Sequence, residues 1–144
     1  MTNFQIRIDQ SVAHIAEELA GIADDSASAH GNQRVFPTMA EAINFAALVG
    51  FRAKKKKAVE NARKDPIRSQ IFESNQLQGY ICLIAVAETN DIDCLRDEGF
   101  EESVRLYEEY AFGGFLTIEQ WGKESGKPLF ERILNEMTNI AAEI

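Results

Sequence analysis

The chain has 144 residues, of which 45% are hydrophobic and 26% charged, and its formal net charge is -8. These values are ordinary for a globular protein and predict one domain over residues 1–144 with its own core. The acidic balance argues against a general nucleic-acid coat protein, and no apolar run approaches the roughly 18 residues of a membrane span. Cys82 and Cys94 lack the spacing of a metal site, and we interpret them as free thiols of a cytoplasmic protein.

Residues 4–8 read Phe-Gln-Ile-Arg-Ile, and this alternation of apolar and polar side chains predicts a strand with one buried face. So short a strand needs a partner, either from elsewhere in the chain or from a second copy in a homodimer. Ser11 is expected to cap a helix that extends to about Ala23. Its apolar stripe is Val12, Ile15, Ala16, Leu19 and Ile22. The composition of residues 24–35 predicts a loop.

The most apolar stretch of the chain predicts a central helix over about residues 38–50. Thr38 can act as its N-cap, and Glu41 three places later would complete a capping box. Gly50 can adopt the left-handed conformation that ends a helix. Glu41 and Asn44 are the polar residues inside this helix, and they share one side of it. A helix that is apolar around the rest of its circumference must be buried there, so we expect the other elements to pack around it.

A basic segment follows at residues 52–68. Eight basic residues against two acidic ones give it a net charge of +6. Since the whole chain has a net charge of -8, the rest of the chain carries -14. Residues 79–87 are apolar throughout, and alanines near their end favour a buried helix over a buried strand. Residues 88–109 are acidic, with nine carboxylates against Arg96 and Arg105.

The last third of the chain predicts further helices. A helix is expected over residues 101–112, with Gly113-Gly114 interrupting it and a short helix or turn at 115–123. A final helix begins near Pro128, which suits a first helical turn. Its apolar stripe is Phe130, Ile133, Leu134, Met137, Ile140, Ala141 and Ile144. Together the elements predict a mainly α fold, a compact helical bundle around the central helix with one short N-terminal β-strand.

The basic segment is the strongest feature outside the core. Lysine and arginine displace the counterions of DNA, so a phosphate-contacting surface is one interpretation. Its candidate residues are Arg52, Lys54, Lys55, Lys56, Lys57, Arg63 and Lys64. Three alternatives are a solvated face, a patch neutralised by the chain's own acidic residues 88–109, and a contact between subunits.

The N-terminal strand offers a second DNA hypothesis. If the apolar residues point inward, Gln5 and Arg7 point outward, and Arg and Gln are common partners of guanine and adenine. Ribbon-helix-helix dimers place such a strand in the major groove, and the free N–H groups near Thr38 would then hold a phosphate. Those modules join their two helices by a short turn, whereas about a dozen loop residues intervene here. An ordinary edge strand is the preferred interpretation.

Catalytic and metal sites find little support. His14 and His30 have no neighbouring cysteine or serine in a recognisable frame. The acidic residues after position 88 lack the spacing of an EF-hand, and a solvated acidic loop explains them better. We therefore expect no enzyme activity, no cofactor and no metal.

Several short sequences occur in an order that resembles a known family. They are Phe36-Pro-Thr-Met-Ala-Glu-Ala-Ile-Asn-Phe-Ala-Ala-Leu-Val-Gly-Phe-Arg52, Ile71-Phe-Glu73, Leu83-Ile-Ala-Val-Ala-Glu-Thr89 and Tyr107-Glu-Glu-Tyr-Ala-Phe-Gly-Gly-Phe115. Together they resemble small proteins encoded beside bacterial DNA-phosphorothioation (Dnd-type) modification and restriction genes. The resemblance covers about residues 34–116, and residues 117–144 fall outside it.

This resemblance implies a cytoplasmic accessory protein of a DNA-based anti-phage (antiviral) restriction-modification system, and it supplies no catalytic residues. It makes DNA, or another protein of the system, a natural partner. Two functions are therefore expected. The first is a non-enzymatic DNA-associated accessory protein with phosphate contacts through residues 52–68. The alternative is an interaction subunit, oligomeric through its strand, that never touches nucleic acid.

Overall fold

The computed structural model describes residues 3–21, 36–92, 96–125 and 129–143. The predicted loop at 24–35, together with His30, Cys94 and Pro128, lies outside them. In chain order the elements are β1 (Gln5–Ile6), a 3-10 turn (Gln10–Val12), α1 (Ala13–Leu19), α3 (Met39–Ala53), β2 (Ile67–Arg68), α4 (Ser69–Ser74), α5 (Gln78–Thr89), α6 (Asp97–Ser125) and α7 (Leu129–Glu143).

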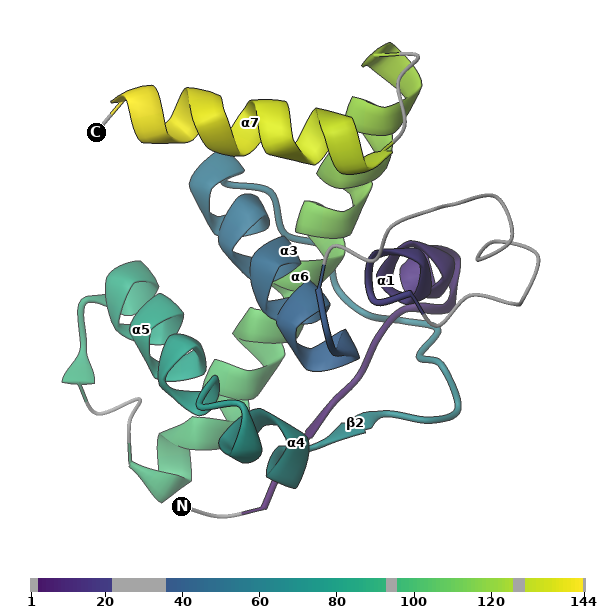
Figure 1. Cartoon of the computed structure of the whole chain (residues 1–144). Helices are drawn as coiled ribbons and strands as arrows, with labels where there is room; N and C mark the ends of the chain where they lie inside the picture. The colour runs from purple at the N-terminus through teal and green to yellow at the C-terminus, as the bar shows by residue number, and fades with distance from the viewer. Residues whose placement is uncertain (1–2, 22–35, 93–95, 126–128, 144) are drawn as a thin grey trace.

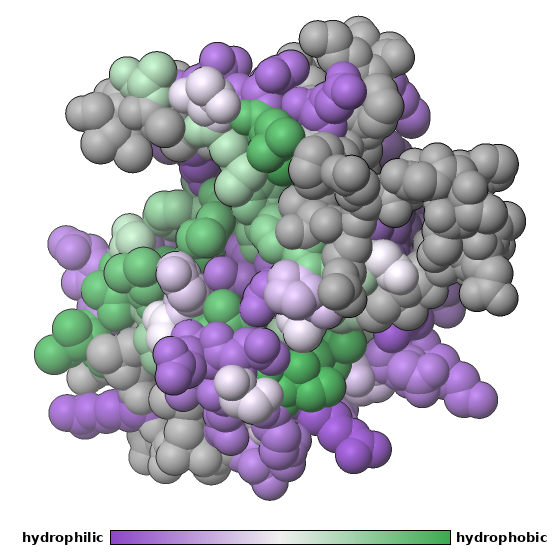
Figure 2. All heavy atoms as spheres, in the orientation of Figure 1, coloured by the Kyte–Doolittle hydropathy of each residue, from purple (hydrophilic) through white to green (hydrophobic). Residues whose placement is uncertain are grey.

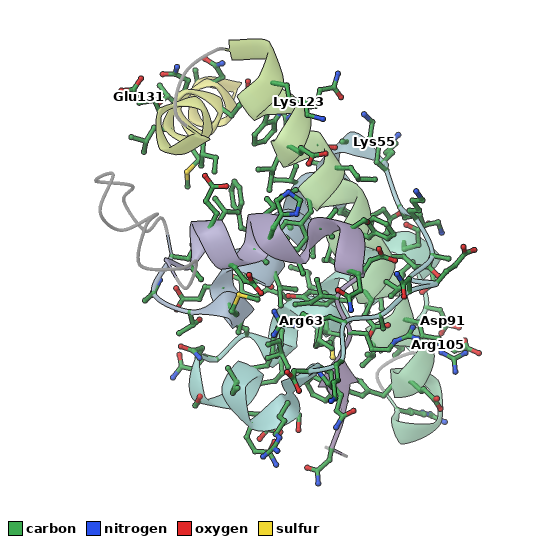
Figure 3. All side chains as sticks on the ribbon, turned by 90° about the vertical axis from the view of Figure 1, so that its right-hand side faces the viewer. Lys55, Arg63, Asp91, Arg105, Lys123 and Glu131 are labelled. Carbon is green, nitrogen blue, oxygen red and sulfur yellow. The ribbon has the colours of Figure 1, made fainter. Side chains whose placement is uncertain are left out.

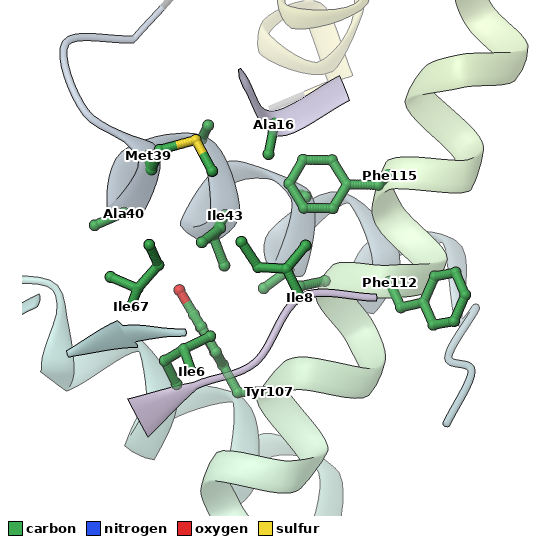
Figure 4. Close-up of a cluster of buried hydrophobic side chains, with 14 of the residues drawn as sticks. Ile6, Ile8, Ala16, Met39, Ala40, Ile43, Ile67, Tyr107, Phe112 and Phe115 are labelled. Carbon is green, nitrogen blue, oxygen red and sulfur yellow. The ribbon is translucent and has the colours of Figure 1, made fainter. Parts of the chain in front are cut away.

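The fold is built on the crossing of α3 and α6, with α1, α5 and α7 around them (Figure 1). This confirms the mainly helical architecture and the central helix. The core lies between α3, α6 and the N-terminal segment, where Ile6, Ile8, Ile43, Tyr107 and Phe115 meet (Figure 4). These side chains are at most 4% exposed, and removal of so much apolar surface from water is the main stabilising contribution to the fold.

The central helix begins as predicted but ends later. The hydroxyl of Thr38 accepts a hydrogen bond from the N–H of Glu41 at 3.2 Å, which caps α3. The helix does not stop at Gly50. It continues to Ala53, and Lys54 takes the left-handed conformation, with φ 57°, that closes the helix. The hydroxyl of Tyr107 donates to the buried amide oxygen of Asn44 at 2.7 Å, which satisfies a polar group inside the core.

The predicted break at Gly113-Gly114 is wrong, because α6 passes through it without interruption. Gly114, together with Gly50 of α3, instead allows α3 to approach α6. A Cβ on Gly114 would lie 1.7 Å from the carbonyl oxygen of Ala46, and a Cβ on Gly50 would lie 2.0 Å from that of Tyr110. The two helices therefore touch backbone to backbone at this crossing, as small residues permit.

The N-terminal strand finds its partner within the chain. β1 pairs antiparallel with β2, with Gln5 opposite Arg68 and Ile6 opposite Ile67. The predicted alternation is confirmed, since Ile6 and Ile8 are buried while Gln5 and Arg7 are exposed. A second copy is not needed to complete this two-stranded sheet.

The turn after the strand is capped by a residue other than Ser11. The carboxylate of Asp9 accepts hydrogen bonds from the N–H of Ser11 at 3.0 Å and from its hydroxyl at 2.7 Å. It also accepts one from the N–H of Asn61 at 3.3 Å. Asp9 therefore both starts the helical region and ties it to the basic segment.

Residues 79–87 are helical, as predicted, and form most of α5. They are not buried throughout, because Leu83 is 58% exposed. In α7, Ile133 is buried, but Leu134 and Met137 of the same predicted stripe are exposed. Among the described residues, no helix combines the length and apolar character that crossing a membrane requires.

Candidate nucleic-acid interface

The four lysines at 54–57 form an exposed segment that leaves the end of α3 and lies along α6. Its course is set by main-chain hydrogen bonds. The N–H of Lys55 donates to the carbonyl of Gly50 at 2.9 Å, and the N–H of Lys57 donates to the carbonyl of Glu109 at 3.1 Å. The backbone is therefore held on both helices, while the side chains project from it.

Gly113 makes this position possible. A Cβ at Gly113 would lie 2.1 Å from the carbonyl oxygen of Lys55, so a larger residue would push the segment away from α6. Between the segment and the helix lies an open groove of about 490 Å³. Its lining residues are Lys54, Lys55, Lys56, Lys57, Gly113, Leu116, Thr117 and Gln120. The groove walls thus carry four cations and no carboxylate.

Lys54 and Lys55 have no ion pair among the described residues, and both are exposed. Figure 3 shows Lys55 on the outside of the molecule near the end of α3. Two neighbouring ammonium groups without a counterion in the described part of the chain attract an external anion such as a phosphate.

Lys56 and Lys57 lie over aromatic rings of α6. The ammonium of Lys56 is 5.7 Å from the ring centre of Tyr110, and that of Lys57 is 5.1 Å from the ring centre of Phe112. Such cation–π contacts orient a lysine while leaving it charged. Lys56 also lies 3.7 Å from a carboxylate oxygen of Glu88, a distance typical of a weak, exposed ion pair.

Tyr110 connects the lysine segment to α5. Its hydroxyl donates a hydrogen bond to the carboxylate of Glu88. Burial, together with this hydrogen bond, raises the pKa of Tyr110 to about 12. Tyr110 therefore stays neutral at physiological pH and holds Glu88 beside Lys56.

The remaining cations of the basic segment are placed differently. Arg63 forms an ion pair with Glu17 of α1 at 3.0 Å and is partly buried, which suits a structural role. Arg52 is exposed and interacts within the chain. Lys64 is exposed and forms no ion pair among the described residues. Figure 3 shows Arg63 apart from Lys55, so the predicted residues do not form one continuous surface.

The two strand residues lie outside the lysine groove. Gln5 is exposed on β1. Arg7 donates from its side chain to the buried carboxylate of Glu108 at 2.8 Å and from its main-chain N–H at 2.6 Å. The side-chain hydrogen bond to Glu108, aided by the negative charges of Glu108 and Glu109, raises the pKa of the Arg7 guanidinium. Since the N–H of Arg7 is taken, a second strand could not pair there without displacing Glu108.

The sequence did not reveal the internal partners of these cations. The carboxylate of Glu108 meets Arg7 across 101 positions of the chain, and one sequence carries no signal for such a pair. The glycines and aromatics of residues 110–115 were visible as a pattern, but their contact with the lysine segment was not. Neutralisation by the acidic residues 88–109, one of the alternatives, occurs at Lys56, whereas Lys54 and Lys55 have no such pair within the described residues.

A metal site is not formed by the described residues, which place no three His, Cys, Asp or Glu side chains together. His14 is exposed and lies 3.5 Å from Glu119. The fold and site thus define a small helical protein with a lysine-lined groove on its surface.

The chain belongs to the family described as DNA sulphur modification system-associated protein 4, whose profile matches residues 7–143. This match confirms the resemblance seen in the sequence and extends it in both directions. Residues 117–143, which fell outside the resemblance, are part of the family pattern. Comparisons with the curated proteins and with the solved structures gave no match.

Proposed function

We propose that this protein is a non-enzymatic, DNA-associated accessory protein of an anti-phage DNA sulphur modification system. Its family is associated with a DNA sulphur modification system, which makes DNA a natural partner. The supporting observation is the lysine groove, in which Lys54 and Lys55 have no counterion among the residues that the structure describes, on a chain that is otherwise strongly acidic.

The chemistry of the groove suits the phosphate backbone better than the bases. Lysine binds phosphate as a flexible point charge and carries no base preference. On the opposite wall, Leu116 and Gly113 have no polar side-chain group, the hydroxyl of Thr117 donates to the carbonyl of Gly113 at 3.0 Å, and Gln120 interacts within the chain. Contact through the groove would position the protein on DNA without selecting a sequence. Gln5, Lys64 and Arg52 are secondary candidates outside it.

The absence of enzymatic activity is part of the same proposal. It is supported by the surroundings of His14, which lies exposed on α1 at 3.5 Å from the carboxylate of Glu119. A catalytic base needs a nucleophile and an orienting group within hydrogen-bond reach.

Binding of a duplex of mixed sequence, measured by fluorescence anisotropy over a range of salt concentrations, tests the proposal. The double variant Lys54→Gln/Lys55→Gln removes two positive charges from the groove. The double variant Arg68→Gln/Arg105→Gln removes the same charge from exposed positions outside the groove, one on β2 at the far end of the basic segment and one on α6. The logarithm of the binding constant falls with the logarithm of the salt concentration, and each phosphate contact contributes about -0.9 to that slope. The groove variant should therefore show a slope that is shallower by about 2.

The matched variant should bind DNA almost as the wild type does. If the wild type shows no affinity at low salt, or if both variants weaken binding equally, the groove is not a DNA contact. A second candidate function, an interaction subunit without nucleic-acid contact, is favoured by the apolar side chains that stay exposed on α5 and α7.

A further inference from the structure

Apolar side chains gather in one band on the face shown in Figure 2, which runs from α7 over α3 to α5. Leu83 of α5 is 58% exposed, Leu134 of α7 is 47% exposed and Met137 is 42% exposed. We call this surface the apolar band. Its members are Phe45, Leu48, Tyr80, Leu83, Leu134 and Met137.

The central helix contributes the middle of the band. From Met39 to Gly50, every residue of α3 is buried except Glu41, Phe45 and Leu48. These positions are spaced four and three apart and therefore lie on one face of the helix. The helix that was predicted to be buried nearly all round thus keeps one stripe partly open, and α3 itself lies between α5 and α7 (Figure 1).

Such a surface requires an explanation. Single exposed apolar residues are normal, but a contiguous patch contributed by three helices is typical of an interaction site. Leu83 and Tyr80 come from a segment without charged residues before Glu88. A surface selected only for contact with water would have polar residues at these positions.

The charges next to the band identify the kind of partner. Glu41 continues the open stripe of α3, and Glu131 lies one helical turn before Leu134 on α7. Arg52, which follows Leu48 by one turn, already interacts within the chain. With the chain's net charge of -8, a second copy would bring carboxylates against carboxylates. A partner with basic residues beside an apolar stripe complements both features.

We propose that the apolar band is the docking surface for a basic amphipathic helix of a partner protein. The apolar stripe of that helix would cover Leu83, Leu48 and Met137, and its lysines or arginines would meet Glu41 and Glu131. The inference does not depend on DNA contact. Figure 3 places Lys55 on the side turned away from this face, so both surfaces can be occupied together.

Two synthetic helical peptides test the proposal with the full chain. Both peptides carry the same stripe of leucines. The residues that flank this stripe are lysines in the first peptide and glutamates in the second. Binding is measured by isothermal titration calorimetry to the wild type and to Leu83→Gln. Ile92→Gln is the matched control, because Ile92 is 72% exposed and apolar but lies beyond the end of α5.

The lysine-flanked peptide should bind the wild type and Ile92→Gln equally, and Leu83→Gln about tenfold more weakly, since one buried leucine side chain is lost from the contact. The glutamate-flanked peptide should bind at least about tenfold more weakly to the wild type than the lysine-flanked one.

Equal binding of both peptides, or no effect of Leu83→Gln, would overturn the assignment. Sedimentation of the wild type alone completes the test. A dimer that Leu83→Gln converts to a monomer would show that a second copy covers the band and would also refute a basic partner helix.

Discussion

Replacement of Gly114 by alanine should destabilise the protein, because the α3–α6 crossing leaves no room for a methyl group. The added Cβ would lie 1.7 Å from the carbonyl oxygen of Ala46, and real Cβ atoms keep at least 3.0 Å. The obstacle is a backbone atom of the central helix, so no change of rotamer can relieve it. The two helices would have to separate along the whole crossing.

The magnitude follows from two opposing contributions. Overpacking in a core typically costs about 1–3 kcal/mol, and so short a backbone contact belongs at the upper end. Alanine in a helix interior gains about 0.5–1 kcal/mol over glycine. The expected net loss is about 2 kcal/mol of the free energy of unfolding. Urea unfolding followed by circular dichroism measures this loss as a lower midpoint at unchanged slope.

Gly79 provides the matched control, because nothing lies within 4 Å of a Cβ built on it. Gly79→Ala should therefore stabilise the protein by about 0.5–1 kcal/mol through helix propensity alone. A midpoint for Gly114→Ala equal to or above that of the wild type would refute the close approach of the helices. Equal losses in both variants would refute the role assigned to position 114.

Two further predictions concern the N-terminal region. Burial tends to raise the pKa of Asp9, but hydrogen bonds from Ser11 and Asn61 outweigh this effect and hold the pKa below its usual 3.8. The ionised Asp9 side chain therefore stabilises the fold above pH 3.8, and this stabilisation is lost as the pH falls through the lowered pKa. The free energy of unfolding should therefore fall less between pH 5 and 2 in Asp9→Asn than in the wild type, and parallel curves would contradict this. Arg7→Met should lower the free energy of unfolding by about 2 kcal/mol. This is less than the loss expected from breaking a fully buried ion pair, because the Arg7 side chain is 45% exposed. An unchanged thermal unfolding temperature would show that Glu108 does not need Arg7 as its partner.

The local signals of this sequence predicted local structure well. The cap at Thr38 and the helix at residues 79–87 follow from hydrogen bonding and composition within a few positions. The alternation of the first strand also predicted which of its side chains are buried. Each of these features depends on residues that are close together in the sequence, so a single sequence is enough to predict it.

The glycines could not be interpreted in the same way. Gly50, Gly113 and Gly114 were expected to end or bend helices, because glycine adopts left-handed backbone conformations easily. The structure uses them for a second property, the missing side chain: Gly50 and Gly114 let the two helices touch, and Gly113 lets the lysine segment lie against α6. Both properties come from the same absent Cβ, so the sequence could not distinguish them before the packing of α3 against α6 was known.

The candidate site was predicted as a run of charge, and the structure divides that run. Arg63 was indistinguishable from Lys55 in the sequence, yet one pairs with Glu17 and the other faces solvent. The exposure of Leu83 was equally hidden, since an apolar run looks the same whether it contacts the protein's own core or a partner. Only distances between remote segments settle such questions.

The main-chain attachment of the lysine segment has a consequence for its variation. Because amide and carbonyl groups fix its path, the ammonium groups of Lys54 and Lys55 contribute little to the scaffold. Related proteins can therefore exchange these side chains for others without refolding the surface. Acetylation of these lysines would likewise remove their positive charge and leave the fold intact, so the charge of this surface can change independently of the fold.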